Sequence, residues 1–112
     1  METVLVRVTE PRTVTWAGAN DSNPISLKGK TTGLQLILDA NFTGTTLTYK
    51  TRQDANSPWV PVQKAGSSIT DTVTGSLASC NVLDAADLFG LTELIITSNN
   101  SETCTGTLLI TA

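Results

Sequence analysis

The chain has 112 residues, with seven Lys and Arg against ten Asp and Glu, a net charge of −3 and no histidine. Charged residues make up only 15% of the chain, whereas threonine occurs twenty times, a composition that favours β structure. Without histidine, an imidazole base, an imidazole metal ligand and a Ser–His pair are excluded. Nucleic acid binding is not expected either, because it needs a basic patch.

The length and patterning predict a single domain over residues 1–112. The longest apolar runs, at residues 34–38 and 94–96, are far shorter than the ~20 residues of a membrane span. The N-terminal residues lack the basic region, apolar run and cleavage site of a signal peptide. We therefore expect no membrane association, and synthesis in a cytoplasm, with release by cell lysis where the protein leaves it.

Alternation of apolar and polar residues predicts about seven to nine short strands. They fall at residues 3–8, 13–16, 25–27, 34–38, 46–50, 59–62, 69–73, 93–98 and 103–111. Pro11 is expected to separate the first two strands, residues 17–24 to form a loop, and residues 99–101 to form a hairpin turn between the last two. Pro61 predicts an edge or bulged strand. The pattern is typical of an all-β fold, an antiparallel β-sandwich of the jelly-roll or immunoglobulin-like kind.

Residues 84–89 depart from this alternation. Asp84 is suited to cap the first turn of a helix, and Asp87 lies near its third position. Leu88 and Phe89 supply an apolar end, and Gly90 a stop. This segment predicts one short helical turn.

Paired carboxylates are the remaining catalytic option, but most of the six Asp and four Glu fall in predicted turns or caps. The Asp and Asn clusters at residues 20–23 and 54–56 lack the spacing of a calcium loop, and turn formation explains both. We therefore predict no enzyme activity, no catalytic residue, no metal site and no cofactor.

Two residue types leave alternatives open. Cys80 and Cys104 are predicted to be reduced thiols, although they can pair if their strands are adjacent. Trp59 is predicted to seal one end of the core. For Trp16, a core position and an exposed role, as an interface anchor or a sugar-stacking platform, are equally supported.

The charges are unevenly distributed along the chain. Residues 1–64 carry seven basic and five acidic residues, a balance of +2, and residues 65–112 carry five acidic residues and no basic one. A basic and an acidic face would orient the domain on a charged partner. Alternatively, the two halves interleave in the sandwich and the charges cancel.

A set of core and turn residues in the middle and end of the chain has a familiar arrangement. It comprises Phe42, Gly44, Leu47, Tyr49, Thr51, Asp54, Trp59, Pro61, Val62, Gly66, Leu83, Leu88, Phe89, Gly90, Leu94, Ile95, Ile96 and Ser98. Over residues 34–111 this arrangement resembles small all-β structural proteins of tailed bacteriophages. The resemblance implies a virion component, either a head decoration (cement) protein or a tail or fibre-associated part, and it carries no catalytic or ligand residues.

From this resemblance we expect a capsid decoration protein that binds the major capsid protein lattice and stabilises the head. Its expected location is the capsid surface of the virion, after synthesis in the host bacterial cytoplasm, as a homo-oligomer (trimer or dimer). Residues 1–33 lie outside the resemblance and are predicted to form edge strands or an attachment arm. The predicted partner contacts are Val4, Leu5, Arg7, Arg12 and Trp16. The alternatives are a tail, baseplate or fibre component and a carbohydrate-binding module that uses Trp16 or Trp59.

Overall fold

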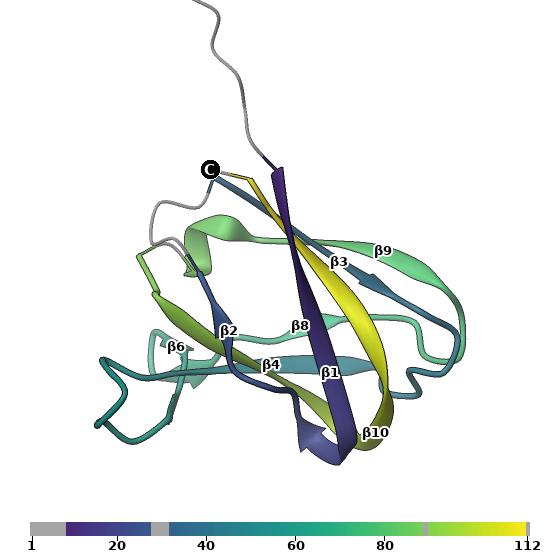
Figure 1. The fold of residues 1–112 in the computed structure, drawn as a ribbon. Coiled ribbons are helices and arrows are strands. Elements are labelled where there is room, and N and C mark those ends of the chain that lie inside the picture. The colour runs from purple at the N-terminus through teal and green to yellow at the C-terminus, as the bar shows by residue number, and fades with distance from the viewer. Residues whose placement is uncertain (1–8, 28–31, 89, 112) are drawn as a thin grey trace, which may run out of the picture.

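A single curled sheet encloses the core of the computed structural model, which describes residues 9–27, 32–88 and 90–111 (Figure 1). The central strand order is β5–β4–β10–β3–β9, with β1 and β2 also paired with β10, and β8 paired with β4. β6 and β7 form a separate hairpin. The elements are β1 (Thr9–Asp21), β2 (Ile25–Ser26), β3 (Gly33–Leu38), β4 (Thr46–Thr51), β5 (Val60–Pro61), β6 (Gln63–Lys64), β7 (Ser67–Ser68), β8 (Asp71–Thr72), β9 (Ser79–Leu83), the 3₁₀ turn η1 (Ala85–Leu88) and β10 (Glu93–Thr111). All the pairings are antiparallel, which confirms the predicted all-β antiparallel class.

Strand β10 joins the two layers of the sandwich. Its first part pairs with β4, where Ile95 lies opposite Lys50. Its last part lies between β3 and β1, where Leu108 is opposite Leu36 on one side and Arg12 on the other. Because one strand belongs to both layers, the sandwich is formed by one sheet that folds over itself rather than by two separate sheets.

Two predicted breaks in the chain are wrong. The expected hairpin at residues 99–101 is part of β10, and the register with β1 jumps from Glu102 opposite Ala19 to Thr97 opposite Asp21. The chain therefore bends sharply there, at an irregularity in the strand (Figure 1), but forms no hairpin, because the two parts of β10 pair with other strands and not with each other. β1 also continues through Pro11, because β1 is an edge strand in which a missing N–H need not face β10.

The long strands β1 and β10, of 13 and 19 residues, replace the short ones expected. β1 extends to Asp21, so the predicted loop at residues 17–24 shortens to residues 22–24. The predicted strand at residues 3–8 lies outside the described residues.

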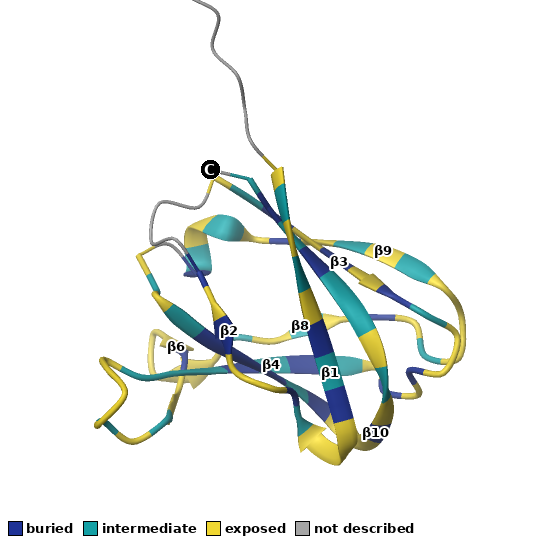
Figure 2. Cartoon of the chain, in the orientation of Figure 1, coloured by how far each residue is buried: buried dark blue, intermediate teal, exposed yellow. Residues whose placement is uncertain are grey.

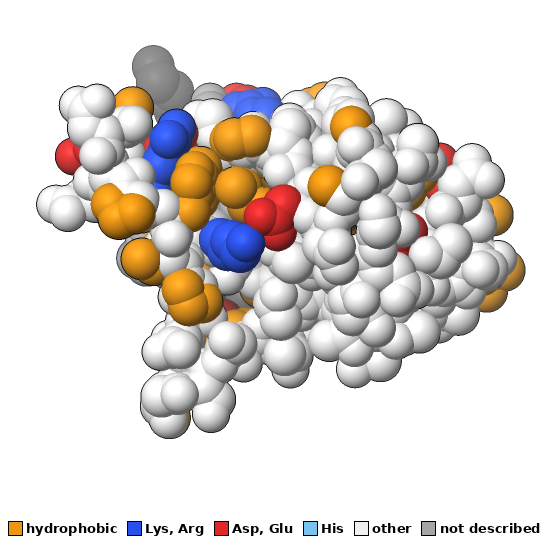
Figure 3. All heavy atoms as spheres, turned by 90° about the horizontal axis from the view of Figure 1, so that it is seen from below, with side chains coloured by type: hydrophobic (Ala, Val, Ile, Leu, Met, Phe, Trp, Pro, Cys, Tyr) orange, Lys and Arg blue, Asp and Glu red, His pale blue; other side chains and the backbone are white. Residues whose placement is uncertain are grey.

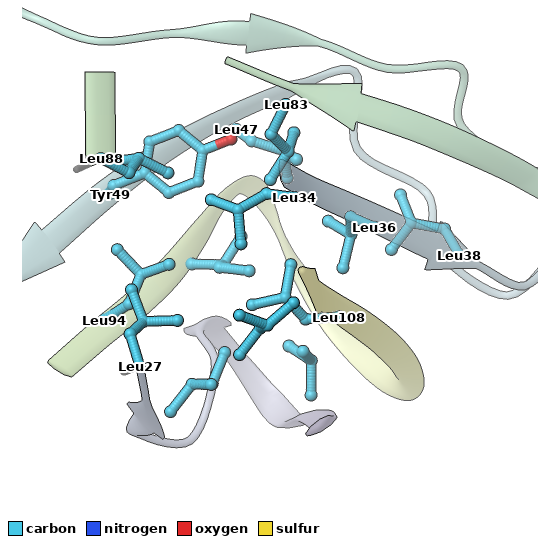
Figure 4. Close-up of a cluster of buried hydrophobic side chains, with 14 of the residues drawn as sticks. Leu27, Leu34, Leu36, Leu38, Leu47, Tyr49, Leu83, Leu88, Leu94 and Leu108 are labelled. Atoms are coloured by element: carbon cyan, nitrogen blue, oxygen red, sulfur yellow. The ribbon is translucent and has the colours of Figure 1, made fainter. Parts of the chain in front are cut away.

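The core forms where the alternating apolar residues face inward. Leu34, Leu36 and Leu38 of β3 are all buried and pack with side chains from β1, β4 and β10 (Figure 4). The ring of Trp16 meets that of Phe42 edge to face, with 5.1 Å between the centroids. At residues 13–17 of β1 and 107–111 of β10, buried positions alternate with exposed or intermediate ones (Figure 2). The outward side of these strands is therefore a separate surface.

The predicted helical turn is confirmed as η1. Oδ1 of Asp84 accepts a hydrogen bond of 3.0 Å from the amide of Ala86, as expected of a cap, and Leu88 anchors the turn in the core. Phe89 lies outside the described residues. The described part of the chain has no helix with the length and apolarity needed to cross a bilayer.

Candidate interaction face

The outward side of strands β1, β10, β3 and β9 forms a continuous surface without charge, which we call the threonine face. The strand registers place its residues in rows that cross all four strands, as in Thr13–Thr107–Ile37–Cys80 and Pro11–Leu109–Gln35–Val82. The face comprises Thr9, Pro11, Thr13, Thr15, Ala17, Gly33, Gln35, Ile37, Cys80, Val82, Thr103, Thr105, Thr107, Leu109 and Thr111, all exposed or intermediate in burial.

The absence of charge is a feature that this face shares with the cores of protein interfaces. Interface cores are depleted in charged residues, since charges are costly to strip of water. The threonine face offers hydroxyl and methyl groups, which can bond or pack against a partner without that penalty. The sheet spacing gives it a projected area on the order of 500 Å². That is a large share of the ~800 Å² per partner that standard interfaces bury.

Of the predicted contact residues, the two that the structure describes, Arg12 and Trp16, do not lie on this face. Val4, Leu5 and Arg7 are outside the described residues. Trp16 is only 1% exposed, and its indole N–H donates to the carbonyl of Ile96 at 3.2 Å, so it cannot serve as an exposed anchor. This corrects its assignment as a partner contact and answers the question left open by the sequence: Trp16 belongs to the core.

Arg12 also lies on the inward side of β1, at the end of the core. Its guanidinium pairs with the Glu10 carboxylate at 2.9 Å and donates to the carbonyl of Ser26 at 3.3 Å. The outward positions of the same strand are its odd-numbered neighbours, Thr13 among them. Arg12 and Trp16 thus belong to the inward side of β1, whereas the threonine face is its outward side.

The charged halves of the chain interleave. Among the described residues every Lys and Arg belongs to an ion pair, and two of these pairs join the basic half to the acidic half: Arg52 with Glu93 and Lys64 with Asp87. Lys50 pairs with Asp21 at 2.8 Å. Burial raises the pKa of Asp21, but hydrogen bonds from Lys50 and Thr97 hold it below its usual range. The +2 and −5 of the linear sequence thus do not form separate basic and acidic faces in the described structure.

Trp59 is the more exposed tryptophan and lies beneath a charged side chain. The guanidinium carbon of Arg52 lies 4.6 Å from the centroid of the ring, and Nε of the same guanidinium donates to Glu93 at 2.7 Å. This hydrogen bond raises the pKa of Arg52 and lowers that of Glu93. Trp59 is half-buried and is not part of the core cluster, so the prediction that it seals the core is not confirmed.

A shallow hollow of about 420 Å³ lies beside this cluster, lined by Thr51, Arg52, Gln53, Val60, Leu91 and Thr92 among others. In the view from below, hydrophobic and charged side chains gather at one side of the molecule, and the rest of that surface is largely uncharged (Figure 3). The guanidinium already covers the Trp59 ring and is held by Glu93, which limits how far the ring can stack on a sugar.

The carboxylates of the described residues have structural partners. Asp54 accepts hydrogen bonds from the amide of Asn56 and the hydroxyl of Ser57, as expected for a turn. Asp71 accepts the Tyr49 hydroxyl at 2.6 Å, and burial together with this bond raises the pKa of Tyr49. No group of three or more Cys, Asp or Glu side chains in the described ranges is placed to hold a metal ion.

The two cysteines are free, as predicted. Cys80 on β9 is exposed and Cys104 on β10 is half-buried, and strand β3 lies between their strands. Burial raises the pKa of Cys104 to about 11, with further contributions from the negative charges of Asp39 and Glu102.

Comparisons of the chain with protein-family models, with curated proteins and with solved structures find no match.

Proposed function

We propose that this chain is a structural binding domain of a tailed-phage virion, a decoration protein that attaches to the major capsid protein lattice and stabilises the head. The observation that carries the proposal is the threonine face, a wide, charge-free sheet surface that suits contact with another protein. The resemblance of residues 34–111 to phage structural proteins supports the choice of partner. The chain has no catalytic role in this proposal.

The mechanism is binding linkage. A protein that binds the assembled shell, and not its separated subunits, stabilises the shell by its binding free energy at the prevailing concentration. Rows of threonine hydroxyls, such as those of Thr13 and Thr107, can donate to and accept from backbone groups of the lattice. The methyl groups of the same residues pack against apolar surface. In this proposal the domain acts by binding, through many weak interactions spread over the threonine face.

The proposal is tested by locating the chain in virions. Heads and tails from the phage that encodes it are separated and analysed by mass spectrometry. The proposal expects the chain to travel with the heads, in many copies. Recovery with the tails alone would move it to the tail, baseplate or fibre alternative, and absence from both fractions would contradict a virion role.

A further inference from the structure

Strand β9 (Ser79–Leu83) forms one end of the sheet and, among the described strands, pairs only with β3 (Figure 1). Its sequence contains neither a charged residue nor a proline, the two features with which edge strands commonly avoid pairing with other chains. An antiparallel edge strand leaves alternate N–H and C=O groups facing outward. β9 is therefore open to the addition of another strand.

The sheet edges at β1 and at the outer side of β4 are covered or interrupted. At β1, the amide of Thr15 donates to Oδ1 of Asn23 at 2.7 Å, and the amide of Asn23 donates back to the carbonyl of Thr15 at 2.9 Å. Pro11 removes one further donor from that edge. The outer side of β4 carries β5 and β8, and β5 contains Pro61. The contrast singles out β9.

Exposed apolar side chains gather around the same edge. Val82, in β9 itself, is 78% exposed, and Leu77, two residues before the strand, is 59% exposed. Ile37, opposite Cys80 on the adjacent strand, is 40% exposed. A hollow of about 510 Å³ opens at the other end of β9, with Val82, Leu83, Asp84, Ala85 and Ala86 in its lining. One short strand thus has an exposed leucine just before its first residue, and an exposed valine and a hollow at its other end.

We propose that β9 pairs with β9 of a second copy of this chain, antiparallel and about a two-fold axis at Asn81. This register places Val82 opposite Cys80 of the second copy and Ser79 opposite Leu83. The two Val82 side chains become diagonal neighbours on the outer surface, close enough to cover each other. No charge of β9 faces a like charge, because β9 has none.

The same register explains the apolar residue outside the strand. It brings Leu77 level with Ala85 of the second copy, at the rim of the hollow at the end of β9. The two-fold axis repeats this contact at the opposite end, so both exposed leucines and both hollows are used. Such an isologous contact closes at two copies. A partner of unrelated sequence would have to supply this pattern independently, and for this reason we assign the edge to a second copy.

The dimer extends the proposed function by naming the surface through which copies associate. It joins two threonine faces into one surface across a continuous sheet. Pairing through five-residue strands buries less than the ~800 Å² per partner of standard interfaces, so we expect a dimer that dissociates on dilution. Self-association of the chain can be measured without virions. A chain that stays monomeric would overturn the β9 pairing but not the decoration role. Absence of the chain from heads would overturn the decoration role but not the β9 pairing.

The test is sedimentation equilibrium of the full chain, in reducing buffer, from micromolar to millimolar concentrations. The expected result is a reversible monomer–dimer equilibrium that Val82→Lys weakens at least tenfold. Val60→Lys is the matched control, because Val60 is also exposed, at 47%, but lies in β5. A parent chain that stays monomeric, or a dimer that Val82→Lys leaves unchanged, would overturn the proposal.

Cross-linking tests the register. With Cys104→Ser and native Cys80, Val82→Cys places a cysteine opposite Cys80 of the second copy, and mild oxidation should give a covalent dimer. Val60→Cys in the same background has no cysteine opposite it and should remain monomeric on denaturing gels. Equal cross-linking of the two variants would contradict the register. A dimer that is lost when residues 1–8 are deleted, but retained in Val82→Lys, would instead assign the association to the N-terminal segment.

Discussion

The carboxylate of Glu102 accepts a hydrogen bond of 2.8 Å from the amide of Gly44, which precedes it by 58 residues. The same side chain accepts the amide and the hydroxyl of Thr43, each at 2.9 Å, and the hydroxyl of Ser98 at 2.7 Å. Glu102 is only 1% exposed. It therefore joins the turn before β4 to the bulge of β10, and holds the bulge where the sequence suggests a hairpin.

Replacing Glu102 with glutamine should destabilise the fold by about 2–4 kcal/mol. The glutamine side chain has no charge, and its NH₂ group would face N–H and O–H donors where the carboxylate now offers an accepting oxygen. The free energy of unfolding in urea measures this loss. Glu93→Gln is the matched control: Glu93 lies nearer the surface, bonded to Arg52, and a much smaller loss is expected. Equal losses at the two positions would show that the Glu102 network contributes little.

Acid should weaken the same network. Burial raises the pKa of Glu102, but the hydrogen bonds from Thr43, Ser98 and Gly44 outweigh it and hold the pKa below its ordinary value of 4.5. A pKa depressed by folding gives stability that is complete above the unfolded-state pKa and is lost as the pH falls through the folded one. The gap in unfolding free energy between the parent and Glu102→Gln should therefore narrow in acid, and a gap independent of pH would contradict this assignment.

A methyl group at position 75 should be poorly tolerated. A Cβ on Gly75 would collide with the backbone carbonyl oxygens of Thr43 and Gly44, which cannot move without shifting the turn. We expect Gly75→Ala to cost about 1–3 kcal/mol of stability. At Gly33 the nearest described atom is Cβ of Thr111 at 3.5 Å, an ordinary contact, so Gly33→Ala should have little effect. Thermal unfolding of the two variants distinguishes these outcomes.

The two tryptophans should behave differently. Trp16→Ala empties a fully buried site and breaks the bond to the Ile96 carbonyl, for which we expect a loss of about 3–5 kcal/mol. Trp59→Ala removes only the stack with Arg52 and should leave the fold nearly as stable.

On a glycan array we expect no binding by the parent or by Trp59→Ala. Glycan binding that disappears with Trp59→Ala would favour the carbohydrate-binding alternative.

The cysteines should react at different rates. Cys80 is exposed, so at low protein concentration a thiol reagent should modify it rapidly in the folded protein. Cys104 should react slowly until the protein is denatured, since burial raises its pKa to about 11. Denaturation without reductant should expose two thiols in total, and no reactive thiol under these conditions would indicate a disulfide.

The local sequence pattern is sufficient to predict a strand where one face of that strand is buried. The alternation of Leu34, Leu36 and Leu38 predicts β3 because their burial follows the period of the strand. The cap at Asp84 was predictable for a similar reason, since it depends on residues within one turn. β9 was not predicted, because its outward position holds the apolar Val82 rather than a polar residue, and this hides the alternation.

The remaining features depend on contacts between distant residues. Residues 99–101 read as a turn, and only the bonds from Glu102 to Thr43 and Gly44 explain why β10 continues past them. The threonine face depends on which strands are neighbours, and composition carries no information on strand order. Whether Trp16 lies in the core or on the surface depends on which face of the strand its side chain takes, because a shift of one residue along a strand moves a side chain from one face to the other.

The proposed function requires the threonine face to be the capsid-binding surface, and one substitution tests this most directly. Thr105 is exposed on that face, in the central strand β10, and Thr74 is exposed on the loop before β9, outside it. Co-sedimentation with purified heads that lack the protein compares the parent with Thr105→Lys and Thr74→Lys. We predict that Thr105→Lys weakens binding at least tenfold, about 1.4 kcal/mol, while Thr74→Lys binds like the parent. Undiminished binding by Thr105→Lys would contradict the proposed role of the threonine face.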